Sequence, residues 1–232
     1  MKYDRESYYP WMTDKTLRIK DIYAVLHSEV LDFVHWIEQS PEERSTRENL
    51  VKRIKKVVKG CYPDAVVMVF GSCATGLNLP MSDIDLLVYN PGVSELTQIN
   101  KISNALVKSG ICKSIEPLKH TKVPLIKMQD KQTNINVDVS FNRTNGIYCV
   151  KLVKFLQKKY PELRPMILIL KSFLKSRQFN ETYHGGVGSF LLTMLVTSYL
   201  QREYKKGGTD KMDLGRHLVQ FFHLYGQTFN YD

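Results

Sequence analysis

The sequence contains few cysteines and no long apolar run. Its four cysteines are widely spaced and form no C-x-x-C pair: Cys61, Cys73, Cys112 and Cys149. This spacing argues against a zinc site or a disulfide framework and is typical of reduced thiols in an intracellular protein. The longest nearly apolar stretch, residues 190–200, is about half of the roughly 20 residues that a membrane span needs. The first ten residues lack the apolar region of a signal peptide, so we expect neither an integral membrane protein nor a secreted one.

Acidic residues are scarce relative to basic ones. The 232 residues include 33 Lys and Arg against 23 Asp and Glu, which gives a formal net charge of +10. Residues 146–232 carry 13 basic and 6 acidic side chains, so most of the excess lies in the last third. A concentrated positive field attracts polyanions, although a solubilising surface has the same composition. The chain is 43% hydrophobic and 24% charged, which is typical of a folded globular protein and excludes a disordered one.

The sequence also lacks internal repeats and low-complexity segments. Apolar residues at helical spacing predict helices at about residues 14–38, 40–59, 94–108, 146–158, 163–177, 187–204 and 211–225. Short β-branched and apolar runs predict strands at 66–70, 84–89, 111–117, 122–128 and 134–141. A mixed α/β block between two helical ends indicates an α+β fold, in which the two ends could pack together as one layer.

Local signals near the N-terminus are informative. Ser40 can cap a helix, Pro41 suits its first position, and Glu43 completes a capping box, which predicts a helix start. Residues 14–38 carry apolar side chains near helical spacing, so we expect a single amphipathic helix there.

Residues 66–70 are β-branched and apolar, and they predict a buried strand.

The segment from Phe70 to Val88 carries the strongest chemical signal. A strand ends at Phe70, and Gly71-Ser72 follows, where backbone N–H groups at a turn could face an anion. Asp83 and Asp85 then open the next strand, and side chains two apart project from the same face, about 6.5–7 Å along it. Two adjacent carboxylates repel each other unless a cation lies between them, and Mg²⁺ prefers carboxylate and phosphate oxygens.

A third carboxylate lies on a later strand. Alternation in residues 135–141 puts Asp138 on the face opposite Val137 and Val139, and an acid centred on a strand face is unusual in a purely structural strand. Three aspartates on neighbouring strands can hold two metal ions about 3.5–4 Å apart, one activating the attacking hydroxyl and one steadying a leaving pyrophosphate. Asp138 would touch the metal near the hydroxyl and could also take its proton.

These motifs together resemble the DNA polymerase β-like nucleotidyltransferase superfamily, in which Gly-Ser, Asp-x-Asp and a third Asp recur. The resemblance is closest to the noncanonical poly(A) polymerases, which include the catalytic subunits of TRAMP-type complexes. The matching segments are Phe70 to Val88, Lys122 to Lys127, Asp138 to Asn142, Thr144 to Gly146 and Gly185 to Phe190. The similarity covers most of the chain, from about Pro10-Trp11 to Phe229-Asn230-Tyr231.

The resemblance implies a role for each matching residue. Asp83, Asp85 and Asp138 match the catalytic, metal-binding triad, and Gly71 and Ser72 match the turn that holds the triphosphate. The other matches are nucleotide contacts: Asn145 to the ribose hydroxyls, Lys171, Lys175 and Ser189 to the triphosphate, and Phe190 stacked on the base. Taken alone, a lysine pair four apart is more often a solvated helix face, and Phe190 would be read as core.

The resemblance also implies an architecture and an activity. We expect a mixed-sheet nucleotidyltransferase catalytic domain at 60–144 and an all-helical central domain formed by 1–59 and 145–232. The expected reaction adds AMP from ATP to an RNA 3′ end without a template, with two Mg²⁺ or Mn²⁺ ions. The family further implies a nuclear role in RNA surveillance, with a zinc-knuckle RNA-binding protein and an RNA helicase as partners.

The sequence departs from the family pattern at its end. Family members continue past the Phe229-Asn230-Tyr231 match with a helical segment and a base-selecting loop, whereas this chain ends at Asp232, so it is either minimal or shortened. ATP and UTP preference both stay open, and a terminal uridylyltransferase is an alternative. The chain has no zinc knuckle, RRM signature or Arg-rich tail. A catalytically silent RNA-binding scaffold and a transferase acting on a small molecule or a protein are further alternatives.

Overall fold

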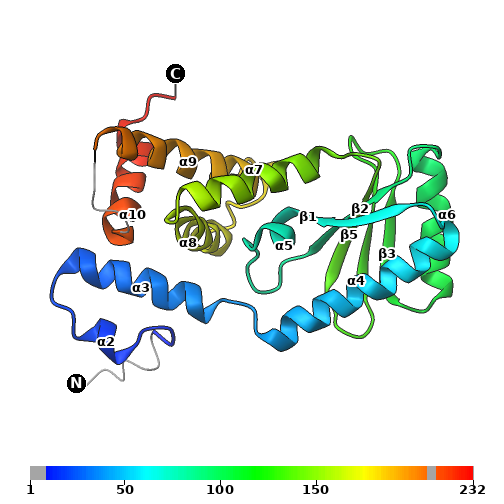
Figure 1. The fold of residues 1–232 in the computed structure, drawn as a ribbon, viewed down its shortest axis with the longest axis horizontal. Helices are drawn as coiled ribbons and strands as arrows, with labels where there is room; N and C mark the ends of the chain where they lie inside the picture. Colours follow the sequence, from blue (N-terminus) through cyan, green and yellow to red (C-terminus); the bar gives the residue numbers. More distant parts are fainter. Residues whose placement is uncertain (1–8, 208–212, 232) are drawn as a thin grey trace. The chain divides into compact units, whose positions relative to one another are not determined.

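The computed structural model describes residues 9–207 and 213–231, which fold into two compact units (Figure 1). The α/β unit comprises residues 39–154. The helical unit comprises the described residues of 1–38 and 155–232, so both ends of the chain contribute to it. None of the helices in these described ranges is both long and apolar enough to cross a bilayer.

The α/β unit contains a mixed five-stranded sheet. Its strands are β1 (Val66–Phe70), β2 (Ile84–Tyr89), β3 (Cys112–Leu118), β4 (Leu125–Asp130) and β5 (Asn136–Phe141). They lie in the order β1-β2-β5-β4-β3, with β2 and β5 parallel and the other neighbours antiparallel. The mixed sheet confirms the predicted α+β fold class.

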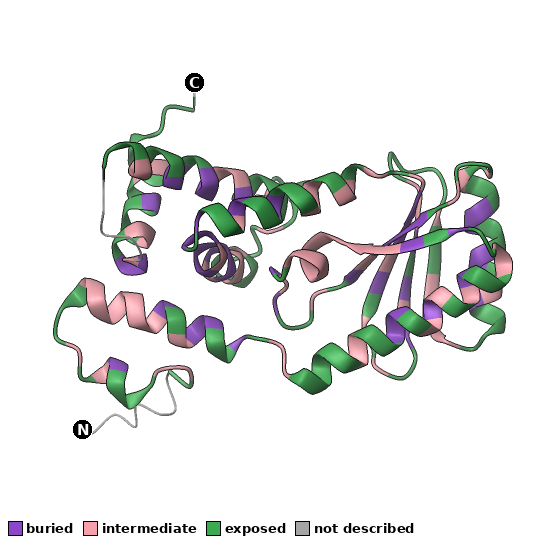
Figure 2. Cartoon of the chain, viewed as in Figure 1, coloured by how far each residue is buried: buried purple, intermediate pink, exposed green. Residues whose placement is uncertain are grey.

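Two helices pack on one face of this sheet. They are α4 (Pro41–Cys61), which starts with the predicted capping box, and α6 (Glu95–Lys108), which Ser94 caps. Buried side chains of both helices form one core with alternate residues of the strands: Leu50, Ile54, Val58, Ile99, Ile102, Leu106, Ile84, Leu86, Val137 and Val139. Figure 2 shows buried residues along the strands and on parts of both helices. Because strand side chains alternate, the intervening residues point to the opposite face.

We call that opposite surface the polar face. Its residues follow from the strand registers: Asp85 lies beside Asp138, Asp138 beside Lys127, and Lys127 beside Glu116. A second row pairs Asn136 with Gln129 and Gln129 with Ser114. The short helix α5 (Gly71–Thr75) packs near β1 and β2.

The helical unit is built from both chain ends. Its helices are α2 (Asp14–Leu17), α3 (Ile22–Trp36), the C-terminal part of α7 (Asn145–Lys159), α8 (Leu163–Ser176), α9 (Ser189–Lys205) and α10 (Leu214–His223). A short 3-10 turn, η1 (Thr182–His184), precedes α9, and a wider π-type turn, η2 (Leu224–Thr228), follows α10. Helices α3, α8 and α10 pack on one another, and α8 packs on α9.

The structure differs from the predicted elements at three places. The helix expected at 14–38 is two helices, because Asp21 caps α3 by accepting a hydrogen bond from the Ala24 N–H (2.8 Å). The strand expected at 122–128 begins later, at Leu125, where it pairs with Leu118. The sequence predicts a buried strand at 66–70, but Val66 of β1 is exposed, because side chains alternate and it is the next residue, Val67, that packs into the core. Residues 211–212 of the last predicted helix lie outside the described residues.

The compact units differ from the predicted domains. They group α4 and the N-terminal part of α7 with the sheet, whereas the predicted catalytic domain spans 60–144 alone. The predicted boundaries therefore stay a prediction about domain organisation.

Candidate active site

Two aspartates lie side by side on the polar face. Asp85 of β2 and Asp138 of β5 are register partners in the parallel pair. Neighbouring strands are about 4.8 Å apart, so the two carboxylates leave the sheet from adjacent positions. Their neighbours Ile84 and Val137, also partners, point into the core and fix this orientation.

Asp83 lies just before β2 and is held by two hydrogen bonds. Its Oδ1 accepts from the Asn136 side-chain amide (3.3 Å), and its carbonyl oxygen accepts from Cys73 Sγ (3.3 Å). The first bond links Asp83 to the start of β5, and the second links it to α5. The chain therefore holds all three predicted aspartates at the same part of the sheet.

The ionisation of Asp138 is perturbed by its surroundings. Burial raises its pKa, the neighbouring Lys127 ammonium lowers it, and the Asp83 carboxylate raises it, with a net shift above the ordinary value. Burial and a like charge both disfavour the ionised form. A carboxylate in such surroundings would gain from a cation placed beside it.

Gly71 brings the predicted phosphate-binding turn against the aspartates. Its φ is +65°, a left-handed conformation that favours glycine, and an added Cβ would overlap the Asp85 carboxylate. The turn can therefore approach Asp85 only with glycine at this position. Helix α5 begins at Gly71 with no side-chain cap, so the backbone N–H groups of its first turn, including that of Ser72, face outward from the helix end.

Asn145 is tied to the same turn through its neighbour. It is exposed and is the first residue of α7. A Cβ at the next residue, Gly146, would lie 2.6 Å from the Phe70 ring, so the start of α7 packs directly on the end of β1. Gly71 follows Phe70, which places Asn145 near the glycine turn.

The remaining predicted contacts belong to the helical unit. Lys171 and Lys175 are four apart on α8, with Lys171 half-buried and Lys175 exposed. Ser189 and Phe190 begin α9, and the Phe190 side chain is 47% exposed, so it is not a core residue. The preceding turn depends on glycine, because a Cβ at Gly186 would meet the Phe179 backbone oxygen. The contacts of Lys171, Lys175, Ser189 and Phe190 with a nucleotide stay predictions.

The carboxylates suit hard divalent cations. Mg²⁺ is usually held by one or two carboxylates together with waters and substrate phosphates. Asp85 and Asp138 supply such a pair, and Asp83 supplies a third carboxylate nearby. In the part of the chain that the structure describes, no three His, Cys, Asp or Glu side chains converge closely enough to hold an ion by themselves. The donor set therefore fits ions shared with phosphate oxygens better than an all-protein cage.

A polar pocket of about 330 Å³ opens beside Asp83 and Asp138. Most of its lining residues are polar. They are Asp83, Ser114, Ile115, Glu116, Lys127, Met128, Gln129, Asn136 and Asp138. We call it the polar pocket. It lies wholly within the α/β unit, over strands β3, β4 and β5.

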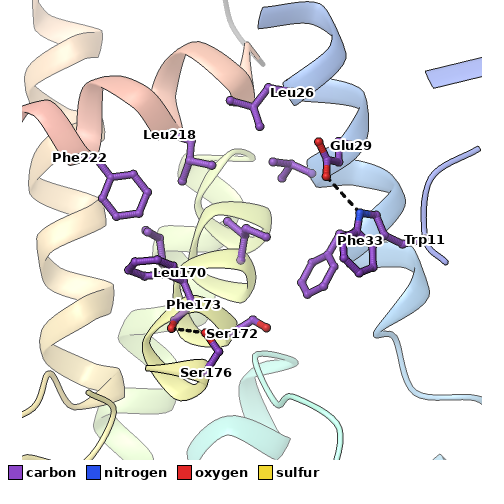
Figure 3. Close-up of a pocket in the computed structure, with 12 residues that line it drawn as sticks. Trp11, Leu26, Glu29, Phe33, Leu170, Ser172, Phe173, Ser176, Leu218 and Phe222 are labelled. Atoms are coloured by element: carbon purple, nitrogen blue, oxygen red, sulfur yellow. Dashed lines mark hydrogen bonds between the residues drawn. The ribbon is translucent and has the colours of Figure 1, made fainter. Parts of the chain in front are cut away.

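The helical unit contains a second pocket of about 290 Å³, which is mostly apolar (Figure 3). It lies among α3, α8, α10 and Trp11, whose indole N–H donates to Glu29 (3.3 Å). Phe33, Phe173 and Phe222 are among its lining residues. A triphosphate needs cationic or N–H donors, and none of the predicted nucleotide contacts lines this pocket.

Two residues beside the aspartates are not among the predicted site residues. Lys127 is the register partner of Asp138, and Asn136 donates to Asp83. Alternation along each strand could have placed both on the polar face. Their proximity to particular aspartates depends on strand register, which no local pattern specified.

The fold matches a solved polymerase core. The structure of the polymerase core of TRAMP, an RNA surveillance complex, superimposes with a TM-score of 0.87 and 36% sequence identity, over 96% of this chain and 71% of that one. The architecture is therefore that of a nucleotidyltransferase core. A family model described as "Poly(A) RNA polymerase, mitochondrial-like, central palm domain" matches residues 26–158. The chain belongs to this family, which confirms the resemblance to noncanonical poly(A) polymerases.

Curated relatives are more than a third identical to this chain over the aligned residues. Poly(A) RNA polymerase protein 1 of Saccharomyces cerevisiae is 39% identical over 233 residues, which cover 97% of this chain and 36% of the relative. The Inactive non-canonical poly(A) RNA polymerase protein Trf4-2 of Drosophila melanogaster is 36% identical, over 96% of this chain and 56% of the relative. The chain thus spans little more than a third of the yeast relative's length, and relatives at similar identity include an inactive one.

Proposed function

We propose that this chain is a template-independent RNA nucleotidyltransferase that adds AMP from ATP to RNA 3′ ends. The observation that carries the proposal is the pairing of Asp85 with Asp138 on adjacent strands. The turn at Gly71 lies against Asp85, and only glycine at this position avoids a collision with the carboxylate. Membership of the poly(A) RNA polymerase family supports the choice of reaction.

In the proposed reaction all three aspartates bind metal ions, and Asp138 also accepts a proton. Asp83, Asp85 and Asp138 would hold two Mg²⁺ or Mn²⁺ ions, which when bound make the hydroxyl a better nucleophile and neutralise the leaving pyrophosphate. The RNA 3′ oxygen forms a bond to the α-phosphorus of ATP, and the bond from that phosphorus to the bridging oxygen breaks. The Asp138 carboxylate accepts the proton of the attacking hydroxyl. The raised pKa of Asp138 favours this role.

Other residues bind the incoming nucleotide. The N–H groups at Gly71 and Ser72 would receive the triphosphate at the start of α5. The family resemblance assigns Lys171, Lys175 and Ser189 to the triphosphate and Phe190 to stacking on the base. Asn145 would hold the ribose hydroxyls. These roles rest on the family resemblance and, for Asn145, Lys175, Ser189 and Phe190, on the exposure of the side chains.

The partners of the reaction are also part of the proposal. The +7 excess in residues 146–232 favours RNA as acceptor, because Lys and Arg release counterions from phosphates on binding. We further propose a nuclear protein that acts in RNA surveillance with a zinc-knuckle RNA-binding protein and an RNA helicase. A salt titration tests the acceptor class, since RNA binding should weaken steeply with salt whereas a small acceptor would show a shallower dependence.

An extension assay tests the reaction. A labelled oligo(A) is incubated with each of the four nucleoside triphosphates under Mg²⁺ and under Mn²⁺, with wild type and with Asp85→Ala. We expect extension by the wild type with ATP and none by the variant. Consumption of UTP in place of ATP would make the protein a terminal uridylyltransferase. Equal extension by Asp85→Ala would remove the triad from the mechanism.

A catalytically silent scaffold is the second candidate. The observation that favours it is the inactive relative, which is nearly as similar to this chain as the polymerase named from yeast. The three aspartates argue against it, since clustered carboxylates would weaken the binding of a polyanion unless cations joined them. RNA binding without extension by any nucleotide, under either metal and with partner proteins added, would select this candidate.

A further inference from the structure

The order of the strands places the glycine turn and the polar pocket on opposite sides of the three aspartates. The Gly71-Ser72 turn follows β1, at one edge of the sheet, and the aspartates lie on or next to β2 and β5. The polar pocket lies on the other side, over β5, β4 and β3. In-line transfer places the leaving group and the attacking group on opposite sides of the reacting phosphorus. If the triphosphate occupies the turn, the attacking strand approaches from the pocket.

We propose that the polar pocket binds the ribose and phosphate of the acceptor strand's 3′-terminal nucleotide. This inference rests on the proposed nucleotidyltransferase function and adds the location and chemistry of acceptor recognition. It assigns Ser114, Gln129 and Lys127 as acceptor contacts, a role that is additional to those of the triad.

The chemistry of the lining suits a sugar and a phosphate. Lys127 is exposed and lies between Asp138 and Glu116, but it forms no hydrogen bond or ion pair with either among the described residues, so its ammonium can turn to a phosphate. It lies beside Asp138, so an anion and a cation project from adjacent strands. A terminal nucleotide offers the matching groups, with a hydroxyl for the carboxylate and a 5′ phosphate for the ammonium.

The pocket also offers neutral hydrogen-bonding groups. Ser114 is exposed, and its hydroxyl can donate or accept. Gln129 is half-buried and uses one amide hydrogen on the Asn134 carbonyl oxygen (3.2 Å), which leaves its Oε1 and a second hydrogen for a ligand. The two are register partners and lie in one row with Asn136. Such groups suit a 2′ hydroxyl, which distinguishes RNA from DNA.

The pocket does not suit a stacked base or a long strand. None of its described lining residues is aromatic, and base binding without sequence readout uses aromatic platforms. Its volume of about 330 Å³ lies at the lower end of the range for ligand pockets, which is enough for one nucleotide. We therefore expect acceptor recognition that depends on the terminal ribose and little on its base.

Acceptor kinetics give the first test. The double variant Ser114→Ala, Gln129→Ala is compared with wild type on an oligo(A) that ends in a ribose and on one that ends in a 2′-deoxyribose. We expect the variant's KM for the ribose-ended acceptor to rise about tenfold, from two lost hydrogen bonds, with a KM for ATP within about twofold of wild type. Its preference for ribose should disappear.

The matched control is Gln132→Ala. Gln132 is exposed, follows β4 and does not line the pocket, so this variant should behave as wild type. An unchanged KM for the acceptor in the double variant, or an equal rise in the KM for ATP, would overturn the assignment.

Photo-crosslinking tests the location without turnover. An oligo(A) that ends in 4-thiouridine is irradiated with the protein, and the crosslinked peptide is identified by mass spectrometry. We expect crosslinks within residues 112–130, which span β3 and β4, and fewer in the double variant. No crosslink, or crosslinks only outside this segment, would contradict the proposal. If extension fails but this crosslink forms, the proposed activity is wrong while the acceptor site stands.

Discussion

The two faces of the sheet each carry an aspartate on a central strand, in contrasting surroundings. On the helix-covered face, Asp130 of β4 has a side chain that is 0% exposed. Its Oδ2 accepts hydrogen bonds from Arg53 (2.9 Å), the Thr133 N–H (2.9 Å) and the Thr133 hydroxyl (2.7 Å). Burial alone would raise the pKa of Asp130, but these bonds and the Arg53 charge outweigh it and hold the pKa below its ordinary value.

Asp138, on the polar face, has the opposite balance. Burial raises its pKa, Asp83 raises it further, and Lys127 offsets only part of the shift. A structural carboxylate is stabilised by the protein itself, whereas a carboxylate whose ionised form is disfavoured is typical of a site completed by a ligand. The comparison indicates that Asp130 stabilises the fold, and it supports the proposal that Asp138 takes part in the chemistry.

Removal of the polar-face charge should have the largest effect. Asp138→Asn should lower the rate of extension at least about 1,000-fold, because in the proposed mechanism this carboxylate binds a metal ion and accepts the proton. Its free energy of unfolding at pH 7 should be unchanged or higher, since a disfavoured charge is lost. Extension kinetics and urea unfolding measure the two effects. A strongly destabilised but active variant would reverse the assignment.

Removal of Arg53, the cation that pairs with Asp130 on the helix-covered face, should lower the stability of the fold. Arg53→Ala leaves Asp130 buried without its ion pair, which should cost about 3 kcal/mol and lower the Tm by roughly 6–12 °C. The control is Lys56→Ala, an exposed lysine on the same helix, which should change stability by less than about 0.5 kcal/mol. Thermal unfolding checks both. Equal stability of the two variants would mean that the ion pair contributes little.

Substitution of two glycines, Gly71 and Gly76, should separate an effect on the reaction rate from an effect on stability. Gly71 and Gly76 both have a left-handed φ, but only at Gly71 would a Cβ collide with Asp85, and Gly76 has open space. Gly71→Ala should displace the carboxylate and slow extension about 100-fold. Gly76→Ala should cost about 1 kcal/mol of stability and leave the rate of the folded protein nearly unchanged. Similar rates for the two variants would show that Asp85 tolerates displacement.

The smallest expected effect is a pH dependence of stability. Because the pKa of Asp130 is lowered in the folded state, the unfolded state binds the proton first as pH falls. The stability that the carboxylate contributes is fully present above its unfolded pKa of about 3.9 and is lost as pH falls through the lower folded pKa. The difference in unfolding free energy between wild type and Asp130→Asn should therefore be constant above about pH 5 and shrink below pH 4. A difference independent of pH throughout would contradict the role of the charge.

Local signals in the sequence predicted much of the fold. The capping box at Ser40 and Glu43 formed as expected, because its partners are three residues apart. Alternation along β5 placed Asp138 on the face opposite Val137, since strand periodicity is also local. The break between α2 and α3 was missed because apolar spacing continues through it, while the cap at Asp21 depends on one side chain.

Non-local relations could not be predicted. The partner of Asp130 is Arg53, 77 residues earlier, and Lys127 meets Asp138 only through the register of β4 on β5. Both depend on packing that brings distant segments together. For the same reason the sequence could not distinguish a buried structural aspartate from one on the polar face. The polar pocket could not be predicted either, because its lining residues come together only through the pairing of β3, β4 and β5.

The most direct test of the account is the rate of RNA extension per folded molecule of Asp138→Asn and of Arg53→Ala, measured below the Tm of both. We predict that Arg53→Ala extends oligo(A) at nearly the wild-type rate, and that Asp138→Asn is at least about 1,000-fold slower. Equal rates for the two variants would contradict the claim that the polar face, and not the helix-covered face, carries the chemistry.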